Sequence, residues 1–343
     1  MFYQTNLKPL IHIMCVTALG IPMTVYIAAQ EVSYVAVLDL DGVLIERPDR
    51  AVRNRIVWRT FQDSWNADDQ KYNIFAFLQS ISILMNKPLM KQQLFNIFTM
   101  VGTQFRIPPT NTDGTPLPAG LCELQAGTMR CADVCTAALN ILEEQEQLEL
   151  IKPIPSLIIR HAITIACSPH EMSMLYKTHK EGIKLLHLLL KSPDAQCMIL
   201  SNFNDEQFEH LRKQPKLAEI FANPRIPSSH IMISGHFHNP EYVKPNPAVF
   251  KRLIAICNDR WHIQPHQILF IDDNLDNIRA AAAEGITAYH ASDKEAFEMI
   301  SNDIMRQYPV LKDPPKRERR KRLKKRLSER RTRKLMRAKK TIN

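Results

Sequence analysis

One apolar stretch that ends in two acids constrains the fold of this chain more than any other feature. Residues 34–44 read Tyr-Val-Ala-Val-Leu-Asp-Leu-Asp-Gly-Val-Leu. An apolar run of this length, rich in Val and closed by Gly, predicts a buried parallel strand. Side chains alternate along a strand, so we expect Asp39 and Asp41 to share one face at its end. Ligands of open α/β sheets bind outside the carboxyl ends of the strands, where two acids can hold a cation and attack an electrophile.

Two later stretches provide further polar side chains at predicted strand ends and turns. Residues 197–202, Cys-Met-Ile-Leu-Ser-Asn, predict a short strand that ends in a hydroxyl and an amide, those of Ser201 and Asn202. Lys244 comes just before a helix that Pro247 starts, because proline is favoured at the first helical position. The sequence therefore predicts a lysine held on a rigid turn rather than on a mobile surface.

A second apolar run repeats the opening pattern. Residues 267–273 predict a buried strand that delivers Asp272 and Asp273 side by side. Burying two like charges together is costly, so these acids need a cation or another partner. The Asp-x-Asp-Gly pattern at residue 39 also occurs in turns and calcium loops. A catalytic site is favoured because three further stretches with polar residues follow it in the chain, at residues 197–202, at Lys244 and at residues 267–273.

The four stretches resemble, in order, the motifs of the haloacid dehalogenase superfamily of phosphatases and phosphotransferases. The first motif of that family is Asp-x-Asp-x-Val/Thr, and residues 39–43 match it. The resemblance covers residues 35–44 and about 197–289. It implies an α/β fold with a Rossmann-like parallel sheet core and a large helical cap inserted after the first motif strand.

The resemblance also implies roles for individual residues. Asp39 is expected to attack phosphorus and form an aspartyl-phosphate. Asp41 is expected to protonate the leaving alkoxide and then to activate the water that hydrolyses the intermediate. Lys244 offsets the negative charge of nucleophile and phosphate, and Ser201 orients a phosphoryl oxygen.

A divalent cation and substrate contacts complete this expectation. Mg²⁺ suits hard oxygen ligands, and the resemblance assigns it to Asp39, the main-chain carbonyl of Asp41 and Asp273. Asp272 is expected beside the ion or acting through water. We further expect Asn202 and Gly42 to contact the substrate, which is a small phosphorylated molecule.

The presence of Asp41 favours one reaction within the superfamily. A dehalogenase releases halide, which needs no proton, whereas a phosphatase must protonate an alkoxide. We therefore predict a hydrolase that cleaves phosphomonoesters. A phosphotransferase or mutase is the alternative within the superfamily, and a catalytically weak protein that its basic tail delivers to a partner is the alternative from another class.

The domain organisation follows from the spacing of these stretches. Residues 31–45 and 197–305 are predicted to form the core, and residues 46–196 the helical cap, in which apolar residues recur at three and four. A proline-rich run at 106–120 predicts a long loop. The helical pattern that starts near Val134 is expected to stop at Pro153 and Pro155. No feature of the cap indicates which substrate it selects.

The first 30 residues form an apolar leader with no charged residue between Pro9 and Gln30. Residues 10–29 resemble a signal peptide, with Ala28 and Ala29 near a cleavage site. A membrane anchor and a buried helix are the alternatives, because about 20 apolar residues just span a bilayer. Export or anchoring is favoured over a cytoplasmic location.

The basicity of the chain belongs to its C-terminal segment. Residues 316–343 hold 16 of the 45 Lys and Arg residues against two acids, a charge of +14, while the whole chain carries +10. The rest of the chain is therefore mildly acidic. We expect residues 306–343 to be a disordered tail that attracts a polyanion, such as nucleic acid or an acidic membrane, through phosphate charge.

The cysteines exclude a small protein that is stabilised mainly by disulfide bonds. Seven scattered cysteines do not form a disulfide framework. Cys131 and Cys135 are spaced as helix neighbours, and no second Cys or His pair completes a zinc site. We therefore expect these two cysteines to be structural.

Overall fold

The computed structural model of the chain describes residues 11–16, 22–27, 32–46, 48–66, 87–101, 118–151 and 153–308. Its centre is a sheet of five strands, and every neighbouring pair in it is parallel. The strands are β3 (Tyr34–Leu38), β6 (Ala195–Ser201), β7 (Ile231–Ile233), β8 (Ile268–Asp272) and β9 (Thr287–His290). The predicted α/β fold with a parallel sheet is confirmed.

The order of the strands determines where a site can form. Across the sheet the order is β7-β6-β3-β8-β9, so the chain moves from β3 to one side and later returns to the other. β3 is the central strand, and all five of its residues are buried. In open sheets, ligands bind at the carboxyl ends of the strands where the order reverses, which here is the edge between β3 and β8.

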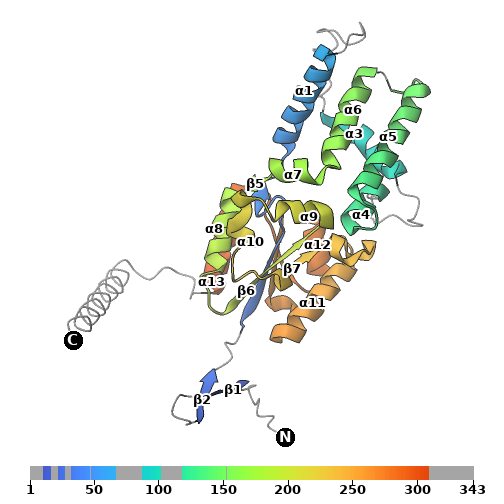
Figure 1. The fold of residues 1–343 in the computed structure, drawn as a ribbon. Coiled ribbons are helices and arrows are strands. Elements are labelled where there is room, and N and C mark those ends of the chain that lie inside the picture. Colours follow the sequence, from blue (N-terminus) through green and yellow to red (C-terminus); the bar gives the residue numbers. More distant parts are fainter. Residues whose placement is uncertain are drawn as a thin grey trace, which may run out of the picture. The chain divides into compact units, whose positions relative to one another are not determined.

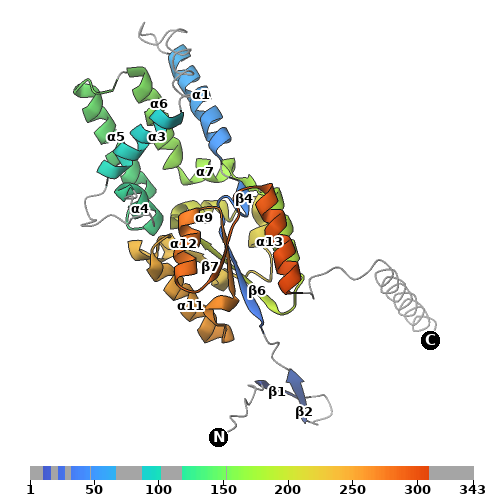
Figure 2. The ribbon, with the colours of Figure 1, turned by 180° about the vertical axis from the view of Figure 1, so that it is seen from behind.

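Helices cover the two faces of this sheet (Figures 1 and 2). On one face, α11 (Pro247–Trp261) and α12 (Leu275–Ala283) pack against β3, β6 and β8 through buried residues such as Phe250, Leu253 and Phe270. On the other face lies α8 (Lys180–Leu189), with Leu185, Leu186 and Leu189 buried. Because both faces are covered, the strands are apolar throughout rather than alternating.

Shorter elements connect the later strands. After β6 come α9 (Asp205–Leu211), α10 (Ala218–Phe221) and the single turns η1 (Pro215–Leu217) and η2 (Ser228–His230). After β7 come η3 (Ser234–Phe237) and η4 (Pro240–Tyr242), and η5 (Pro265–Gln267) precedes β8. The last described helix is α13 (Lys294–Gln307), and the chain divides at Ile300 into two compact units.

The first motif strand is shorter than predicted. β3 ends at Leu38, and the chain then turns, with the Leu44 and Ile45 amides donating to the carbonyl of Leu40 at 3.0 and 2.8 Å. Gly42 has a φ of +82°, a conformation that glycine adopts without steric cost. Asp39 and Asp41 therefore do not share the face of one strand, and their relative placement comes from this turn.

A helical insertion separates β3 from β6. It comprises α1 (Asp49–Asn66), α3 (Lys87–Met100), α4 (Ala119–Ala126), α5 (Cys131–Gln147), α6 (Pro153–Ala166) and α7 (Pro169–Leu175). Helices α3, α5 and α6 share a core of their own that includes Ile97, Val134, Leu142, Ile159 and Ile163. β4 (Ile45–Glu46) and β5 (Lys177–Thr178) pair antiparallel where the chain leaves and returns. The predicted boundaries at residues 46 and 196 stay predictions.

Two local predictions within the insertion need correction. Helix α6 begins at Pro153 and contains Pro155, so these prolines lie in its first turn instead of ending a helix. A proline there removes only an N–H that the helix leaves unused. Of the predicted loop at 106–120, Ala119 and Gly120 belong to α4, and residues 102–117 lie outside the described part of the chain.

The leader contains a β-hairpin where a helix was one alternative. β1 (Ile11–Val16) pairs antiparallel with β2 (Pro22–Ile27), with Ile11 opposite Ile27. The buried-helix interpretation of this stretch is wrong, because Pro22 and the β-branched residues Ile11, Ile13, Val16, Thr24, Val25 and Ile27 favour extended backbone. Among the residues that the structure describes, no helix is long and apolar enough to span a membrane. Residues 316–343 lie outside the described residues.

Candidate active site

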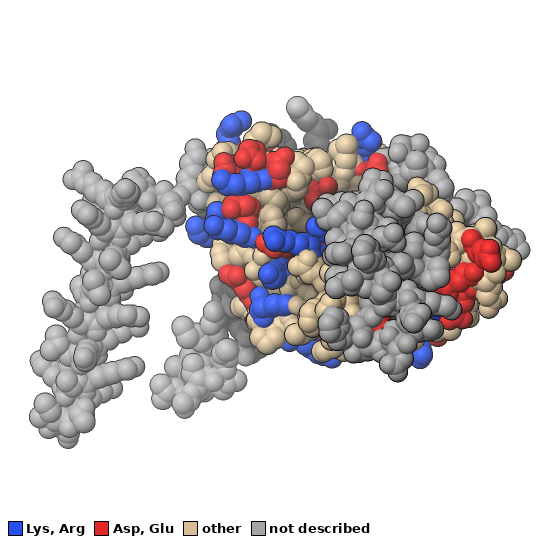
Figure 3. All heavy atoms as spheres, turned by 90° about the horizontal axis from the view of Figure 1, so that it is seen from above, with Lys and Arg blue, Asp and Glu red and all other residues tan. Residues whose placement is uncertain are grey.

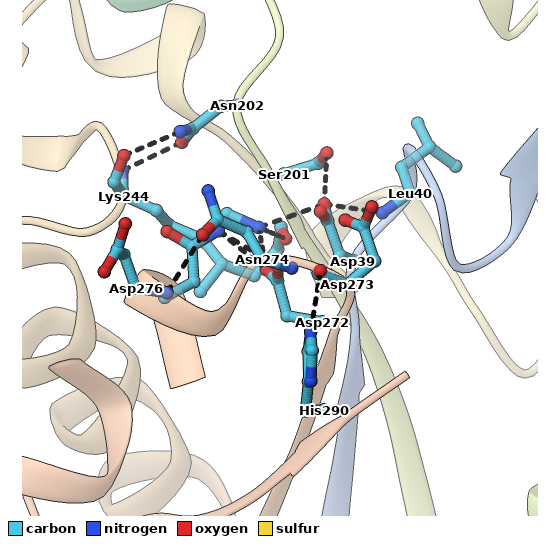
Figure 4. A network of polar contacts seen from close by, with 12 residues as sticks. Asp39, Leu40, Ser201, Asn202, Lys244, Asp272, Asp273, Asn274, Asp276 and His290 are labelled. Carbon is cyan, nitrogen blue, oxygen red and sulfur yellow. Dashed lines mark hydrogen bonds and ion pairs between the residues drawn. The ribbon is translucent and has the colours of Figure 1, made fainter. Parts of the chain in front are cut away.

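The carboxyl group of Asp39 is the centre of a buried polar network at the end of β3 (Figure 4). Its Oδ1 accepts hydrogen bonds from the Ser201 hydroxyl at 2.5 Å and from the Leu40 amide at 2.7 Å. The Nζ of Lys244 lies 3.0 Å from the same oxygen. Three donors on one oxygen fix the orientation of this carboxylate.

Lys244 is an almost completely buried ammonium group, 2% exposed. Besides Asp39, its Nζ contacts Oδ2 of Asp272 at 2.6 Å and the carbonyl of Leu200 at 3.1 Å. These contacts use all three donors of an ammonium. Burial alone lowers the pKa of Lys244, but the charges of Asp272 and Asp39 outweigh it, and the pKa lies above its ordinary value. Lys244 therefore stays charged at neutral pH.

Asp272, the last residue of β8, is fully buried and holds Lys244 in place. Its Oδ1 accepts from the amide of Asn274 at 2.8 Å. The side-chain amide of Asn277 on α12 lies 3.0 Å from both carboxylate oxygens. With Lys244 on Oδ2, each oxygen of Asp272 accepts two hydrogen bonds, so this acid is engaged by the protein itself.

Two carboxylates and one ammonium leave a net negative charge in this buried cluster. Burial is the largest influence on Asp39, and together with the charge of Asp272 it raises the pKa of Asp39 to about 7. Lys244 and the Ser201 hydrogen bond act in the opposite direction without cancelling the effect of burial. A cation bound beside Asp39 would favour its ionised form at neutral pH.

The acids also form a possible cation site. Oxygen atoms of Asp39, Asp272 and Asp273 lie within 4.8 Å of one another, the one such cluster of three or more among the described residues. Gly42 faces the side chain of Asp273, and a Cβ added at Gly42 would stand 2.3 Å from Asp273 Oδ2. Hard carboxylate oxygens around a space that a side chain cannot enter fit Mg²⁺.

Some of the predicted catalytic residues are in direct contact, and others are not. Asp39, Ser201 and Lys244 are in direct contact, and Asp273 joins them through the acidic cluster. Asp41 is half-buried in the turn, where it forms a bridge with Ile45, and its carboxylate is not part of the acidic cluster. The expectation that Asp41 acts through its main-chain carbonyl on the metal and through its carboxyl on the substrate stays a prediction.

Asn202 and Gly42, which were assigned to the substrate, both have partners within the protein. The side-chain amide of Asn202 donates to the carbonyl of Lys244 at 2.8 Å and accepts from its backbone amide at 2.9 Å. The backbone amide of Gly42 donates to Ile45 at 2.9 Å. These contacts are structural, and a substrate contact of either residue remains a prediction.

Sequence analysis overlooked His290 at the end of β9. Its Nε2 donates to the carbonyl of Asp273 at 3.0 Å, which steadies the turn that carries the acids (Figure 4). β9 ends at His290, one residue beyond the stretch that the resemblance covers. A polar residue directly after the fifth strand, at the same edge of the sheet, is a signal that would have identified it.

The fold and site together define a class of protein. A parallel sheet carries a buried carboxylate, a lysine and paired acids at its switch point, which is the arrangement of an α/β enzyme that uses a carboxylate with a cation. The family model of haloacid dehalogenase-like hydrolases matches residues 35–285. The chain belongs to this family of hydrolases, as the resemblance in its motifs predicted.

Solved structures of similar proteins belong to the same family. A haloacid dehalogenase family enzyme from Bacteroides thetaiotaomicron is 17% identical, with 78% of this chain and 98% of that chain covered and a TM-score of 0.42. A haloacid dehalogenase-like hydrolase from Porphyromonas gingivalis is 18% identical, with 76% and 91% covered and a TM-score of 0.36. The Bacteroides enzyme was also crystallised with magnesium and inorganic phosphate. None of the curated proteins matches the chain.

Proposed function

We propose that the chain is a Mg²⁺-dependent phosphomonoester hydrolase that acts through an aspartyl-phosphate on Asp39. The observation that carries this proposal is the oriented, buried carboxylate of Asp39, held by Ser201 and by Lys244 at 3.0 Å. A carboxylate held in this way, with a fixed positive charge beside it, suits attack on a phosphorus atom that bears negative oxygens. The haloacid dehalogenase-like hydrolase family supports this chemistry.

The reaction divides into two steps at the carboxyl end of β3. Asp39 forms a bond to phosphorus while the bond to the leaving oxygen breaks, and Asp41 gives that oxygen its proton. Asp41 then removes a proton from the water that attacks the aspartyl-phosphate and regenerates Asp39. Lys244 stays fixed and offsets charge, and the Ser201 hydroxyl is placed to donate to a phosphoryl oxygen.

We propose that oxygen atoms of Asp39 and Asp273, together with the main-chain carbonyl of Asp41, would hold Mg²⁺, and the proximity of the Asp39 and Asp273 carboxylates supports this. When bound, it would supply positive charge that favours the ionised form of Asp39 and the developing charge on phosphate. Asp272 is the acid least suited to bind it directly, since its two oxygens already accept four hydrogen bonds. We infer that Asp272 positions Lys244 and acts on the metal only through water.

Turnover of an aryl phosphate with and without Mg²⁺ tests this function. We expect hydrolysis to stop in chelator and to return with Mg²⁺ but poorly with Ca²⁺, because calcium takes a looser coordination geometry. Undiminished hydrolysis in chelator would contradict the metal assignment. A panel of phosphorylated sugars, nucleotides, peptides and other metabolites then identifies the substrate.

Replacing Asp41 by asparagine should separate the roles of the two motif acids. We expect turnover of alkyl phosphates to fall about a hundredfold or more, because general acid catalysis typically contributes this much. The loss should be smaller for aryl phosphates, whose leaving groups need less protonation. Equal losses for both substrate types, measured as kcat, would show that Asp41 does not protonate the leaving group.

Two other functions use the same residues. A mutase would return the phosphoryl group to its substrate, and product analysis with a labelled phosphomonoester distinguishes it, since a mutase releases no inorganic phosphate. A catalytically weak binding protein is disfavoured because Asp39, Ser201 and Lys244 are assembled in contact. Absence of turnover across the whole panel would favour it.

We further propose that residues 316–343 bind a polyanion such as nucleic acid or an acidic membrane. On the visible described surface, Lys and Arg are interspersed with Asp and Glu (Figure 3), so the proposal depends on the +14 charge of the tail. For DNA, engaging about six charges predicts a roughly thousandfold weaker affinity at about 200 than at about 50 mM salt. Truncation after Asp313 should abolish heparin binding and leave aryl phosphate turnover unchanged. Heparin binding that survives truncation would refute this role.

For residues 10–29 we propose an export signal or a membrane contact, which makes an exported or anchored location the proposal over a cytoplasmic one. The apolar composition of the stretch supports this. N-terminal sequencing of the protein from its native host is the test. A chain that begins near Gln30 indicates a cleaved signal, whereas an intact leader in the soluble fraction contradicts both export and anchoring.

A further inference from the structure

Three consecutive residues at the carboxyl end of β6, Leu200, Ser201 and Asn202, contact Asp39 or Lys244. Figure 4 shows Ser201 and Asn202 beside these two residues. The carbonyl of Leu200 accepts from Nζ of Lys244 at 3.1 Å. The Ser201 hydroxyl donates to Asp39 at 2.5 Å. The side chain of Asn202 contacts the backbone of Lys244. The end of this one strand therefore positions both Asp39 and Lys244.

The contact of Asn202 with Lys244 is reciprocal. Nδ2 of Asn202 donates to the carbonyl of Lys244 at 2.8 Å, and Oδ1 of Asn202 accepts from the amide of Lys244 at 2.9 Å. Both polar atoms of the side chain are thus used on the same residue. The pattern is the one that a neighbouring strand provides in an antiparallel sheet, where two residues exchange N–H and C=O bonds.

The backbone of Lys244 needs such a partner because of where it lies. It belongs to the turn between η4 and α11, outside the sheet, and the residue is 2% exposed. A buried backbone N–H or C=O without a hydrogen bond is costly, so these groups are almost always paired. The following residue, Pro245, has no N–H to offer. The amide side chain of Asn202 satisfies both groups of Lys244 at once.

From this geometry we propose that Asn202 is a positioning residue for Lys244 rather than a substrate ligand, an inference that rests on the function proposed above. A lysine ammonium is a point charge on a flexible four-carbon stem. Here the stem is held at both ends, with its backbone on Asn202 and its Nζ on Leu200, Asp39 and Asp272. The distance of the charge from Asp39 therefore depends on the Asn202 contact.

The kinetics of Asn202→Ala test this role. We expect kcat for an aryl phosphate to fall about tenfold to a hundredfold, because a displacement near 1 Å at a reacting centre costs about that much. KM and the inhibition constant of inorganic phosphate should change less than threefold. A raised KM with unchanged kcat, or no change in either, would overturn the proposal, since the first identifies a substrate ligand.

Asn239→Ala is the matched control in the same loop. Asn239 is the N-cap of η4, and its side chain accepts from the Glu241 amide at 3.0 Å rather than from Lys244. The Asn239→Ala substitution removes one hydrogen bond between a side chain and the backbone from the segment that leads to Lys244. We expect its kcat to stay within about twofold of wild type. A loss equal to that of Asn202→Ala would show that general loosening of the loop, and not the position of Lys244, explains both variants.

Hydrogen exchange separates this proposal from the proposed function. The amide of Lys244 donates to Asn202, and Pro245 has no amide hydrogen, so exchange at Lys244 is readily isolated by mass spectrometry. We expect exchange at Lys244 at least about tenfold faster in Asn202→Ala than in wild type or Asn239→Ala. Unchanged exchange would overturn the positioning role even in an active enzyme. Faster exchange at Lys244 in Asn202→Ala, combined with a wild type that hydrolyses no phosphate ester, would instead refute the proposed function alone.

Discussion

Asp39→Asn is expected to abolish hydrolysis while the fold stays intact. The variant removes the nucleophile and one proposed metal ligand and leaves the volume of the side chain almost unchanged. Loss of a catalytic nucleophile lowers kcat by roughly ten-thousandfold or more. Steady-state turnover of an aryl phosphate with Mg²⁺ measures the loss. Asp259→Asn, an exposed acid on α11, is the matched control and should retain wild-type turnover.

The same variant should change the stability of the metal-free protein in a pH-dependent way. Burial raises the pKa of Asp39 from an ordinary 3.8 to about 7, so the folded protein holds this proton more tightly than the unfolded chain. Stability from this group is complete below about pH 4 and is lost as the pH rises to about 7. A shift of this size corresponds to about 4 kcal/mol. Asp39→Asn should abolish that loss.

Urea denaturation in chelator at pH 5 and pH 8 measures this effect. We expect Asp39→Asn to be more stable than wild type at pH 8, with a smaller advantage at pH 5. Asp259→Asn should follow wild type at both pH values. Wild-type turnover by Asp39→Asn would refute the assignment of the nucleophile, and equal stability differences at the two pH values would refute the raised pKa.

Lys244→Met is expected to lower both stability and turnover strongly. Methionine keeps an unbranched apolar stem but leaves Asp39 and Asp272 buried beside each other without their shared cation. Removing one partner of a buried ion pair typically costs about 3–5 kcal/mol. Turnover should fall about a hundredfold or more, since a fixed charge at the transition state is lost. The stability loss should shrink at low pH, where the carboxylates bind protons and no longer repel each other.

Lys251→Met provides the comparison for this prediction. The side chain of Lys251 on α11 is 66% exposed and lies 3.8 Å from Glu284. Exposed pairs of this kind contribute at most about 1 kcal/mol, so its denaturation midpoint should stay close to that of wild type. Similar midpoints for the Lys244 and Lys251 variants would mean that the Lys244 cluster does not contribute to stability as its burial indicates.

Much of this arrangement could be predicted from local sequence. The strand that precedes Asp39 is a continuous apolar run, and so is the strand that ends in Asp272. Both strands can therefore be predicted from the sequence alone. Helix α11 starts at Pro247 as predicted, and Asn246 caps it by accepting from the Ala248 amide at 2.9 Å. Interactions between residues that are close in the sequence determine these elements, so the local sequence is sufficient to predict them.

Other features depend on which residues pair with one another, and the apolar pattern does not specify this pairing. A buried helix was one interpretation of the leader, yet the pairing of β1 with β2 makes this stretch a hairpin. The strand through Asp41 was predicted too long, because the turn after Leu38 depends on contacts among Leu40, Leu44 and Ile45. Apolar patterns of this length are compatible with several structures, and the partner that packs against them selects one.

The sequence by itself determined the family, the parallel α/β core and the identity of the acids, the lysine and the serine, because these are properties of residue type and order. Only the tertiary structure decided what each side chain does to the others. Ser201 lies 162 positions from the Asp39 that it contacts, and Asn202 lies 42 positions from the Lys244 backbone that it holds. Such pairings arise from the order of strands in the sheet, which brings separate strand ends to one edge and is not encoded in any single stretch.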